Sequence, residues 1–171
     1  MKHVMVVVGC MVLGGPWAFA ESGKAVIQAT AEGSAVSGEA AFTETPEGLQ
    51  ASIKVSNIPP GKHGLHIHQY GNCADGGNAA GGHYNPHGVK HGFLPKDGFE
   101  GAHAGDLGNI EVGPDGAGKL ELALPGLRLS GGEHSVGGRS VILHEKVDDF
   151  GQPLGNAGGR IGCGVIRIVG E

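Results

Sequence analysis

Six of the ten histidines lie between Gly64 and Asp106, in a stretch with almost no hydrophobic periodicity. It opens with the strand-like run Gly64-Leu65-His66-Ile67-His68. Residues two apart on an extended strand face the same side, so His66 and His68 would project together while Leu65 and Ile67 point to the core. Imidazoles held in this way can share one metal ion. The stretch is therefore predicted to bind metal.

The ligand types divide into two sets. Three imidazoles with one carboxylate suit tetrahedral zinc, and a glycine-rich loop can fold until such a set converges: His83, His91, His103 and Asp106. The imidazole-rich remainder suits copper as well as zinc, and it consists of His66, His68 and the distant His144. Spacing alone leaves the assignment of the two metals open. Strand parity sends His63 to the opposite face, where a structural role is expected.

Short runs of β-branched or alternating apolar residues must position these side chains, and glycine and proline separate them. No helix pattern of useful length is present. About eight strands at this spacing predict an all-β antiparallel sandwich or barrel. Two long excursions without strand signal, 69–105 and 145–162, are expected to be functional loops. The expected strands are Lys24–Thr30, Ala35–Phe42, Leu49–Val55, His63–His68, Leu107–Val112, Lys119–Leu124, Ser140–His144 and Val165–Val169.

The first twenty residues differ from the rest. Lys2 supplies a positive start, an apolar run follows, and Ala18-Phe19-Ala20 has the small-residue pattern of a cleavage site. Residues 1–20 are thus predicted to be a secretory signal cleaved after Ala20, with 21–171 as a single domain in the periplasm or outside the cell. Lipoprotein processing at Cys10 is the alternative. The lipobox-like sequence before Cys10 lies very early, however, and the apolar run continues past it. The run is too short to span a membrane.

Removal of residues 1–20 leaves 11 basic and 17 acidic residues, a net charge of −6, which argues against nucleic acid as a partner. It also leaves two cysteines, Cys73 and Cys163. An even pair in an exported chain is typical of one disulfide.

Five motifs give the chain a close resemblance to the copper/zinc superoxide dismutase family, of the exported bacterial type, over nearly all of residues 21–171. They occur in the family's order. The motifs are Gly64-Leu65-His66-Ile67-His68-Gln69-Tyr70-Gly71, Gly82-His83-Tyr84-Asn85-Pro86 with Lys90-His91-Gly92, His103-Ala104-Gly105-Asp106-Leu107-Gly108-Asn109, His144-Glu145-Lys146-Val147-Asp148-Asp149, and Gly155-Asn156-Ala157-Gly158-Gly159-Arg160-Ile161-Gly162-Cys163-Gly164-Val165.

The resemblance implies an eight-stranded Greek-key barrel, related to the immunoglobulin-like sandwich, and a role for each matching residue. His83 would bridge the two metals as imidazolate. Arg160 would stand beside copper, Asp148 would link a copper ligand to a zinc ligand, and Cys73 with Cys163 would be the family's disulfide. The implied copper ligands are His66, His68, His83 and His144, and the implied zinc ligands are His83, His91, His103 and Asp106.

The implied activity is disproportionation of superoxide to dioxygen and hydrogen peroxide, with His83 and Arg160 as the catalytic residues. A periplasmic copper/zinc carrier or buffer without turnover is the rival interpretation. His87, His134 and His3 match no ligand position. Pro153 and Leu154 stand where the family often has a lysine and a threonine, which leaves the width of the copper channel open. A homodimer is possible, but the sequence does not specify an interface.

Overall fold

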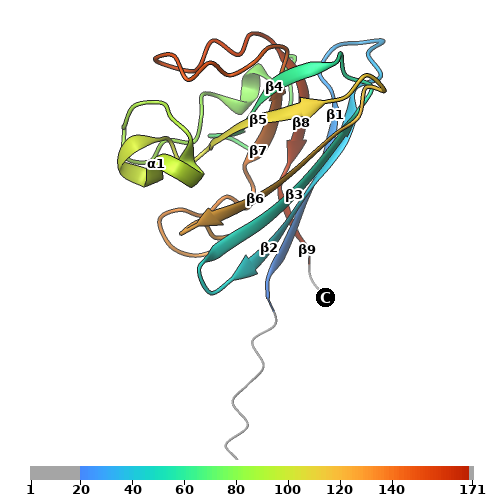
Figure 1. Cartoon of the computed structure of the whole chain (residues 1–171). Coiled ribbons are helices and arrows are strands. Elements are labelled where there is room, and N and C mark those ends of the chain that lie inside the picture. Colours follow the sequence, from blue (N-terminus) through green and yellow to red (C-terminus); the bar gives the residue numbers. More distant parts are fainter. Residues whose placement is uncertain (1–19, 170–171) are drawn as a thin grey trace, which may run out of the picture.

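The computed structural model describes residues 20–169, which form a barrel of antiparallel strands (Figure 1). The predicted signal segment therefore lies outside the described residues, except for Ala20. No helix in the described part is long and apolar enough to cross a membrane. The strands are β1 (Ser22–Ala29), β2 (Ser37–Thr45), β3 (Gly48–Ser56), β4 (Gly61–His68), β5 (Asp106–Val112), β6 (Gly118–Pro125), β7 (Ser140–His144), β8 (Arg160–Val165) and β9 (Arg167–Val169).

Strand pairing closes the sheet on itself. The order is β2-β3-β6-β5-β4-β7-β8-β1-β9, and β1 pairs with β2 as well. Neighbours such as β3 with β6 and β4 with β7 are not consecutive in the chain, which is the Greek-key arrangement. Eight strands thus form the closed barrel and β9 is one short addition. The predicted fold class is confirmed.

The barrel interior is filled by alternate residues of the strands, because successive side chains of a strand point to opposite faces. In β1 the buried residues are Ala25 and Ile27, together with Gly23, and their neighbours face outward. On β4, Leu65 and Ile67 are fully buried in the same core, as predicted. Burial of such apolar side chains stabilises the fold by about 1.5–3 kcal/mol each. The histidines of β4 are therefore mounted on a strand that is packed into the core.

The last strand differs from the prediction. A single strand over Val165–Val169 was expected, whereas β8 begins at Arg160 and the pairing breaks at Ile166. The backbone of Ile166 pairs instead with the preceding loop: its N–H donates to the carbonyl of Arg139, and its carbonyl accepts from Gly138, both at 2.8 Å. β9 then resumes the pairing with β1. Tertiary contacts of this kind leave no local sequence signal.

A short helix is also present where none was expected, α1 (Leu94–Gly101). Pro95 stands in its first turn, where proline is compatible with helix geometry. Gly98 has a φ of 62° and interrupts the helix, so the element is too short to show a helical period. A single 3-10 turn, η1 (Asn78–Ala80), lies in the same excursion.

Both long excursions leave the barrel on one side, as Figure 1 shows. The first joins β4 to β5 and contains η1 and α1, and the second joins β7 to β8. The first is anchored to β4 by backbone hydrogen bonds, such as that from the N–H of Tyr84 to the carbonyl of Ile67 at 2.9 Å. Residues from both loops thereby reach the histidines of β4.

Candidate metal centre

Two clusters of buried metal-binding side chains adjoin each other where the excursions meet β4. Within each cluster, four residues can offer ligand atoms that lie within 4.8 Å of one another. The structure brings together every ligand expected from the sequence, and all of them are buried. Cluster 1 is His66, His68, His83 and His144, and cluster 2 is His83, His91, His103 and Asp106.

The hydrogen bonds around cluster 1 leave one nitrogen of each ring free. His66 uses Nε2 to contact Asp148 at 2.9 Å, and His68 uses Nδ1 to contact the carbonyl of Gly81 at 2.9 Å. Nδ1 of His144 faces the carbonyl of Gly158 at 3.3 Å. The remaining nitrogens are buried without a partner: Nδ1 of His66, Nε2 of His68 and Nε2 of His144. Buried polar atoms rarely stay unpaired, so these atoms fit a bound metal ion, and an all-imidazole set is one that copper accepts.

Cluster 2 has the donor set and spacing of a zinc site. Oδ1 of Asp106 lies 2.9 Å from Nδ1 of His83 and 3.1 Å from Nδ1 of His103, and these two nitrogens are 3.4 Å apart. Ligand atoms of a tetrahedral zinc ion at about 2.0–2.1 Å lie about 3.3 Å from one another. Nδ1 of His91, which is also buried without a hydrogen-bond partner, lies 2.9 Å from Oδ2 of Asp106. Three imidazoles and one carboxylate therefore fit zinc.

His83 belongs to both clusters. Its Nδ1 lies among the cluster 2 atoms, while its ring stacks on His66 of cluster 1 with centroids 3.9 Å apart. β4 and the loop meet here through an isolated bridge between His68 and His83. One imidazole is thus placed to offer a different nitrogen to each cluster.

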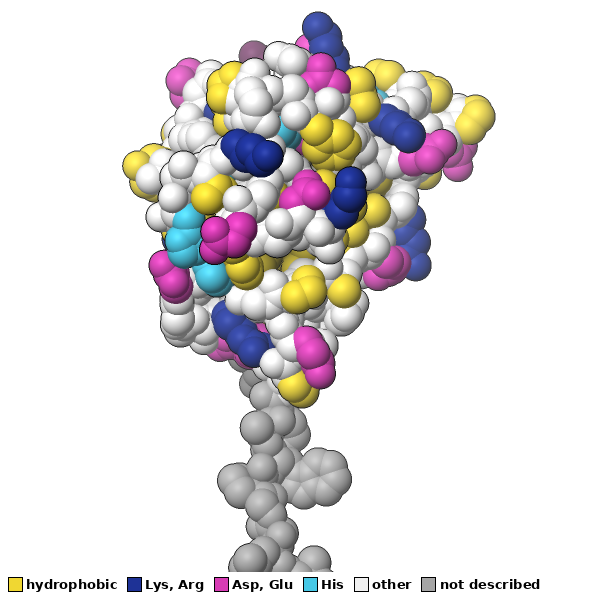
Figure 2. All heavy atoms as spheres, turned by 60° about the vertical axis from the view of Figure 1, so that its left-hand side comes forward, with side chains coloured by type: hydrophobic (Ala, Val, Ile, Leu, Met, Phe, Trp, Pro, Cys, Tyr) yellow, Lys and Arg dark blue, Asp and Glu magenta, His cyan; other side chains and the backbone are white. Residues whose placement is uncertain are grey.

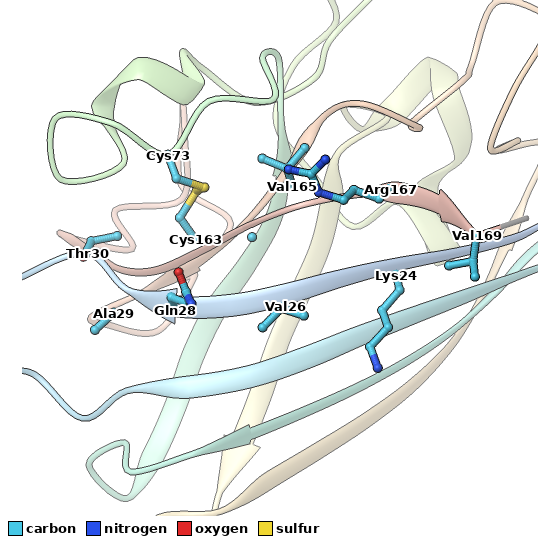
Figure 3. Close-up of a pocket in the computed structure, with 11 residues that line it drawn as sticks. Lys24, Val26, Gln28, Ala29, Thr30, Cys73, Cys163, Val165, Arg167 and Val169 are labelled. Carbon is cyan, nitrogen blue, oxygen red and sulfur yellow. A yellow bond between two sulfur atoms is a disulfide. The ribbon is translucent and has the colours of Figure 1, made fainter.

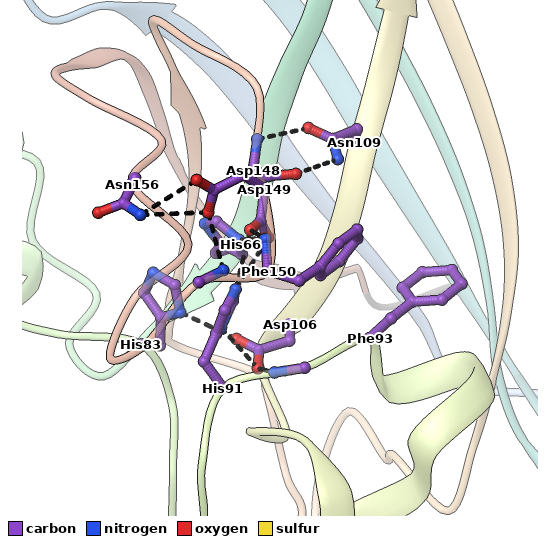
Figure 4. Close-up of polar contacts among 12 residues, drawn as sticks. His66, His83, His91, Phe93, Asp106, Asn109, Asp148, Asp149, Phe150 and Asn156 are labelled. Atoms are coloured by element: carbon purple, nitrogen blue, oxygen red, sulfur yellow. Dashed lines mark hydrogen bonds and ion pairs between the residues drawn. The ribbon is translucent and has the colours of Figure 1, made fainter.

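Asp148 connects the two clusters on their other side (Figure 4). Its Oδ2 lies 2.9 Å from Nε2 of His66, and its Oδ1 lies 2.9 Å from Nε2 of His91. This carboxylate therefore fixes the orientation of one ring in each cluster and leaves the Nδ1 atom of both rings for a metal. It occupies the position that the resemblance implied.

Burial keeps several of the histidines neutral, which is the form that binds metal. It lowers the pKa of His83 to about 4, of His144 to about 3 and of His68 to about 2. The carboxyl of Asp106 is also buried, but close contacts with the rings of His103, His83 and His91 hold its pKa well below the usual range. His91 is the exception: burial opposes its charge, but Asp106 and Asp148 raise its pKa to about 9, so a metal would have to displace a proton there.

Three positioning residues were missed from the sequence. The side chain of Asn109 holds the backbone of Asp148 with two hydrogen bonds of 2.7 and 2.9 Å. Gln152 does the same for the backbone of His91, at 3.1 and 2.9 Å. Gly155 lies so close to Asp148 that a Cβ atom would stand 1.9 Å from Oδ1, and its φ is 75°. Only glycine fits there, although its motif gave no hint of the contact.

Arg160 lies at the mouth of cluster 1. Its guanidinium donates to the carbonyls of Gly77 and Gly81, both at 2.6 Å, which fixes it to the first excursion. It lines a cavity of about 320 Å³ together with His68, His83 and His144. Pro153 and Leu154 line the same cavity, so the departures noted in the sequence stand at its wall.

The predicted disulfide between Cys73 and Cys163 is confirmed. It joins the first excursion to β8, with Cα atoms 5.7 Å apart. On the strand side, Cys163 is held by pairing with Ile142 of β7 and Gln28 of β1. The bond therefore fastens a loop to a strand that is already secured on both sides.

Reduction of this disulfide should lower metal retention before it unfolds the barrel, because the bond anchors the loop and not the strands. After dialysis against a mild chelator, the reduced protein should hold less copper and zinc than the oxidised protein. The Cys73→Ser/Cys163→Ser variant should behave like the reduced protein while keeping its β-sheet circular dichroism. Equal metal content in all three samples would contradict the prediction.

Two other features have no part in the metal clusters. His63 is buried, and its ring nitrogens each lie 2.9 Å from a backbone carbonyl, of His144 and of Pro59, which agrees with a structural role.

A larger hollow of about 560 Å³ lies beside the disulfide (Figure 3). Val26, Val169 and Arg167 are among its lining residues, which include no histidine or carboxylate. The residues that line this hollow therefore could not bind a metal ion as a group.

A closed antiparallel barrel with two adjoining clusters that share one imidazole defines a dinuclear metalloprotein. The family model of copper/zinc superoxide dismutase (SODC) matches residues 36–166. The chain belongs to the copper/zinc superoxide dismutase family. Copper and zinc are accordingly its metals, and its activity is the disproportionation of superoxide.

Similar proteins agree with this membership. The Cu-Zn superoxide dismutase of Onchocerca volvulus is 38% identical over 152 residues, which are 82% of this chain and 94% of that protein. The extracellular Cu-Zn superoxide dismutase of Caenorhabditis elegans is 42% identical over 137 residues, 76% of this chain but 60% of that protein. The crystal structure of the clock protein EA4 superposes with a TM-score of 0.78 at 34% identity, covering 92% of this chain and 100% of that one.

Proposed function

We propose that cluster 1 holds copper and cluster 2 holds zinc, and that this pair disproportionates superoxide. The unpartnered nitrogens of His66, His68 and His144 carry the proposal, because four buried imidazoles suit a copper ion and the carboxylate-containing set suits zinc. When bound, copper supplies a one-electron couple, whereas zinc has no redox chemistry. The remaining chemistry falls to the side chains of this chain.

His83 is proposed to move a proton. In the protein without metal its pKa is already lowered by burial, to about 4. That titration leaves a neutral ring with one proton. Metal ions held by the two clusters would favour loss of this remaining proton, because nearby positive charge stabilises the deprotonated form. When its nitrogen on the side of cluster 1 is not bound to the ion, His83 would hold a proton there, and it would return that proton to the product.

Turnover is the direct test of this function. Protein loaded with copper and zinc should consume superoxide catalytically, while the same protein without copper should not. The rival interpretation is a carrier or buffer of the two metals, which would bind both ions and show no turnover. Catalytic consumption of superoxide would exclude the rival, and its absence in fully loaded protein would exclude the proposal.

Arg160 is proposed to attract the superoxide anion. The mature chain would carry a net charge of −6, which disfavours an approaching anion. A cation within a cleft of low dielectric can nevertheless outweigh distant acids that salt screens. Burial lowers the pKa of Arg160, yet an arginine stays protonated in proteins. Arg160 also lies in the wall of the cavity that leads to cluster 1.

Replacement of Arg160 with isoleucine should slow the reaction by about tenfold, within the range of electrostatic steering, and flatten its dependence on salt. Stopped-flow rates at several ionic strengths measure both effects. Lys119→Gln is the matched control: it also removes one positive charge, but from an exposed position on β6. If Arg160→Ile kept the wild-type rate and salt dependence, the superoxide anion would have to be attracted by another residue, with Lys90, Lys96 or Lys146 as the next candidates.

Export of the bacterial type is a further proposal. It rests on the basic start and apolar run of residues 1–20, on Ala18-Phe19-Ala20 and on the disulfide, which is typical of oxidising compartments. The relatives described above are from nematodes. Full-length protein expressed in a Gram-negative bacterium should accumulate in the periplasm with Glu21 as its first residue. A cytoplasmic product that keeps Met1 would contradict export, and a lipid on Cys10 would favour the lipoprotein alternative.

A homodimer is proposed as well, on the exposed apolar side chains beside the hollow of Figure 3. Val26 is 59% exposed and Val169 is 49% exposed. Sedimentation equilibrium should give twice the chain mass, and Val26→Glu should return it to a single chain. A wild-type protein that sediments as a monomer at high concentration would contradict this proposal.

A further inference from the structure

A third group of possible metal ligands lies outside clusters 1 and 2, at the protein surface. It consists of His87, Glu133 and His134, whose ligand atoms lie within 4.8 Å of one another. None of the three belongs to the other clusters. Figure 2 shows histidine side chains at the surface with acidic side chains beside them, and among the described histidines only His87 and His134 are not buried. We call this group the surface triad.

Local structure holds His87 in place. It sits in a tight turn of the first excursion, and Asn85 spans that turn with two hydrogen bonds to the backbone of Val89, at 2.8 and 3.1 Å. The side chain of His87 is 34% exposed. The turn therefore presents the imidazole from a fixed backbone, which reduces the entropy lost on binding an ion.

His134 and Glu133 come from the loop between β6 and β7. The ring of His134 stacks on Phe99 of α1, with centroids 3.7 Å apart and an angle of 6° between the planes. The carbonyl of Glu133 accepts a hydrogen bond of 2.6 Å from the hydroxyl of Tyr84. Both residues are thus oriented by groups that would not bind the ion, as supporting residues orient ligands in metal sites.

The two rings face each other through their nitrogens. Nε2 of His87 lies 2.7 Å from Nε2 of His134, and Nδ1 of His87 lies 3.7 Å from Oε1 of Glu133. Two facing nitrogens can share only one proton, so at least one lone pair is available between them. Two nitrogen ligands of a tetrahedral ion lie about 3.3 Å apart, so a small separation of the two rings, of which that of His87 is exposed, would admit a metal.

We propose that His87, His134 and Glu133 form a third metal site, which takes a first-row divalent ion such as Zn²⁺ or Cu²⁺. Two imidazoles and one carboxylate make a ligand set that zinc uses with a fourth position left to water. Imidazole ligands select these ions over calcium and magnesium, which prefer oxygen. The site is open to solvent, so its ion exchanges faster than the buried ones.

An ion in the surface triad would tie two segments together. His87 lies in the same excursion as His83 and His91, whereas His134 lies in the loop that leads into β7, the strand of His144. The third metal would therefore cross-link the loop that carries the zinc ligands to the barrel. Its occupancy should protect that loop from local opening.

Metal stoichiometry of the holoenzyme tests the proposal. Untagged full-length protein with copper and zinc already bound is dialysed to equilibrium against micromolar free zinc and analysed by mass spectrometry for metal. The wild type should take up one further zinc per chain. His87→Gln and His134→Gln should each lose this additional ion, and Glu133→Gln should bind it more weakly. Glu100→Gln, an exposed glutamate on α1 outside the triad, should match the wild type.

Copper(II) added at one further equivalent gives a second readout. It should produce an additional spin-resonance signal with coupling to two nitrogens in the wild type, and His134→Gln should lack this signal. Equal zinc uptake by the wild type and a His87→Gln/His134→Gln variant would overturn the proposal. So would a wild type that holds only two metals, since the rings would then be a hydrogen-bonded pair only. Superoxide turnover is not part of this test, so its failure and that of the proposed activity are distinguishable.

Discussion

Replacing His83 with alanine should weaken both metal sites at once, each by more than about tenfold. His83 is the one residue common to clusters 1 and 2, so its loss leaves three ligands in each and admits water. Even removal of a residue that only orients a ligand costs about 10–100-fold in metal affinity. Competition with a chelator, followed separately for copper and for zinc, measures the two losses.

His103→Ala is the matched control, because His103 belongs to cluster 2 alone. This variant should lose zinc affinity and keep copper affinity close to that of the wild type. The copper(II) spin-resonance spectrum of the wild type should also change when zinc is removed, and His83→Ala should show no such response. A His83→Ala protein that loses only one metal would show that the two sites do not share this ligand.

The metal-free, disulfide-bonded protein should lose stability steeply below about pH 6.5. The pKa is lowered by burial to about 4 in His83, about 3 in His144 and about 2 in His68. Between those values and about 6.5 the unfolded chain binds protons that the folded chain excludes, so acid favours unfolding. Each histidine contributes about 1.4 kcal/mol per pH unit, or about 6 kcal/mol for the three at pH 5. The free energy of unfolding of a whole domain is only about 5–15 kcal/mol, so a loss of this size is a large part of it.

At alkaline pH, His91 has the opposite effect, and stability falls as the pH rises. Burial opposes the charge of His91, but the neighbouring carboxylates of Asp106 and Asp148 raise its pKa to about 9. This contribution is complete below about pH 6.5 and is lost as the pH rises to 9. Stability of the metal-free protein should thus be greatest near pH 6.5.

Urea unfolding followed by circular dichroism, from pH 4.5 to 9, measures this profile. His144→Leu should reduce the acid slope by about a quarter, because one buried neutral imidazole is gone while those of His66, His68 and His83 remain. A free energy of unfolding that stays constant between pH 7 and pH 5 would contradict the assignment of these three histidines as neutral in the fold.

The sequence predicted the ligand residues more completely than it predicted how they are held. His66 and His68 are recognisable because strand alternation places them on one face, and the core beneath them follows the same period. The nitrogen that each ring keeps free depends instead on Asp148 and on the carbonyl of Gly81, which lie far along the chain or in its backbone. Such contacts become visible only after folding.

The residues that position the metal ligands were not predicted, for a related reason. Asn109 and Gln152 bind backbone atoms of residues 39 and 61 positions away, and amides in loops are common without such a role. The strand pattern alone left a sandwich and a barrel open, because eight alternating strands are compatible with either, and the closed barrel was implied by the family resemblance. The break at Ile166 depends on tertiary contacts. α1 has only eight residues and is interrupted at Gly98, which is too short for a periodicity window of about 11–18 residues.

α1 also covers the part of the sheet where strand pairing is sparsest, between β5 and β6. β5 and β6 are joined through a single residue pair, Val112 with Gly118, so most of their facing edges carry no ladder. Open strand edges invite pairing with another chain and hence aggregation. α1 packs against both strands, with Leu94 buried and Phe99 against Gly126 just after β6. A loop that serves the metals therefore also blocks strand addition from a neighbouring molecule, and its loosening would expose an edge on which fibrils could grow.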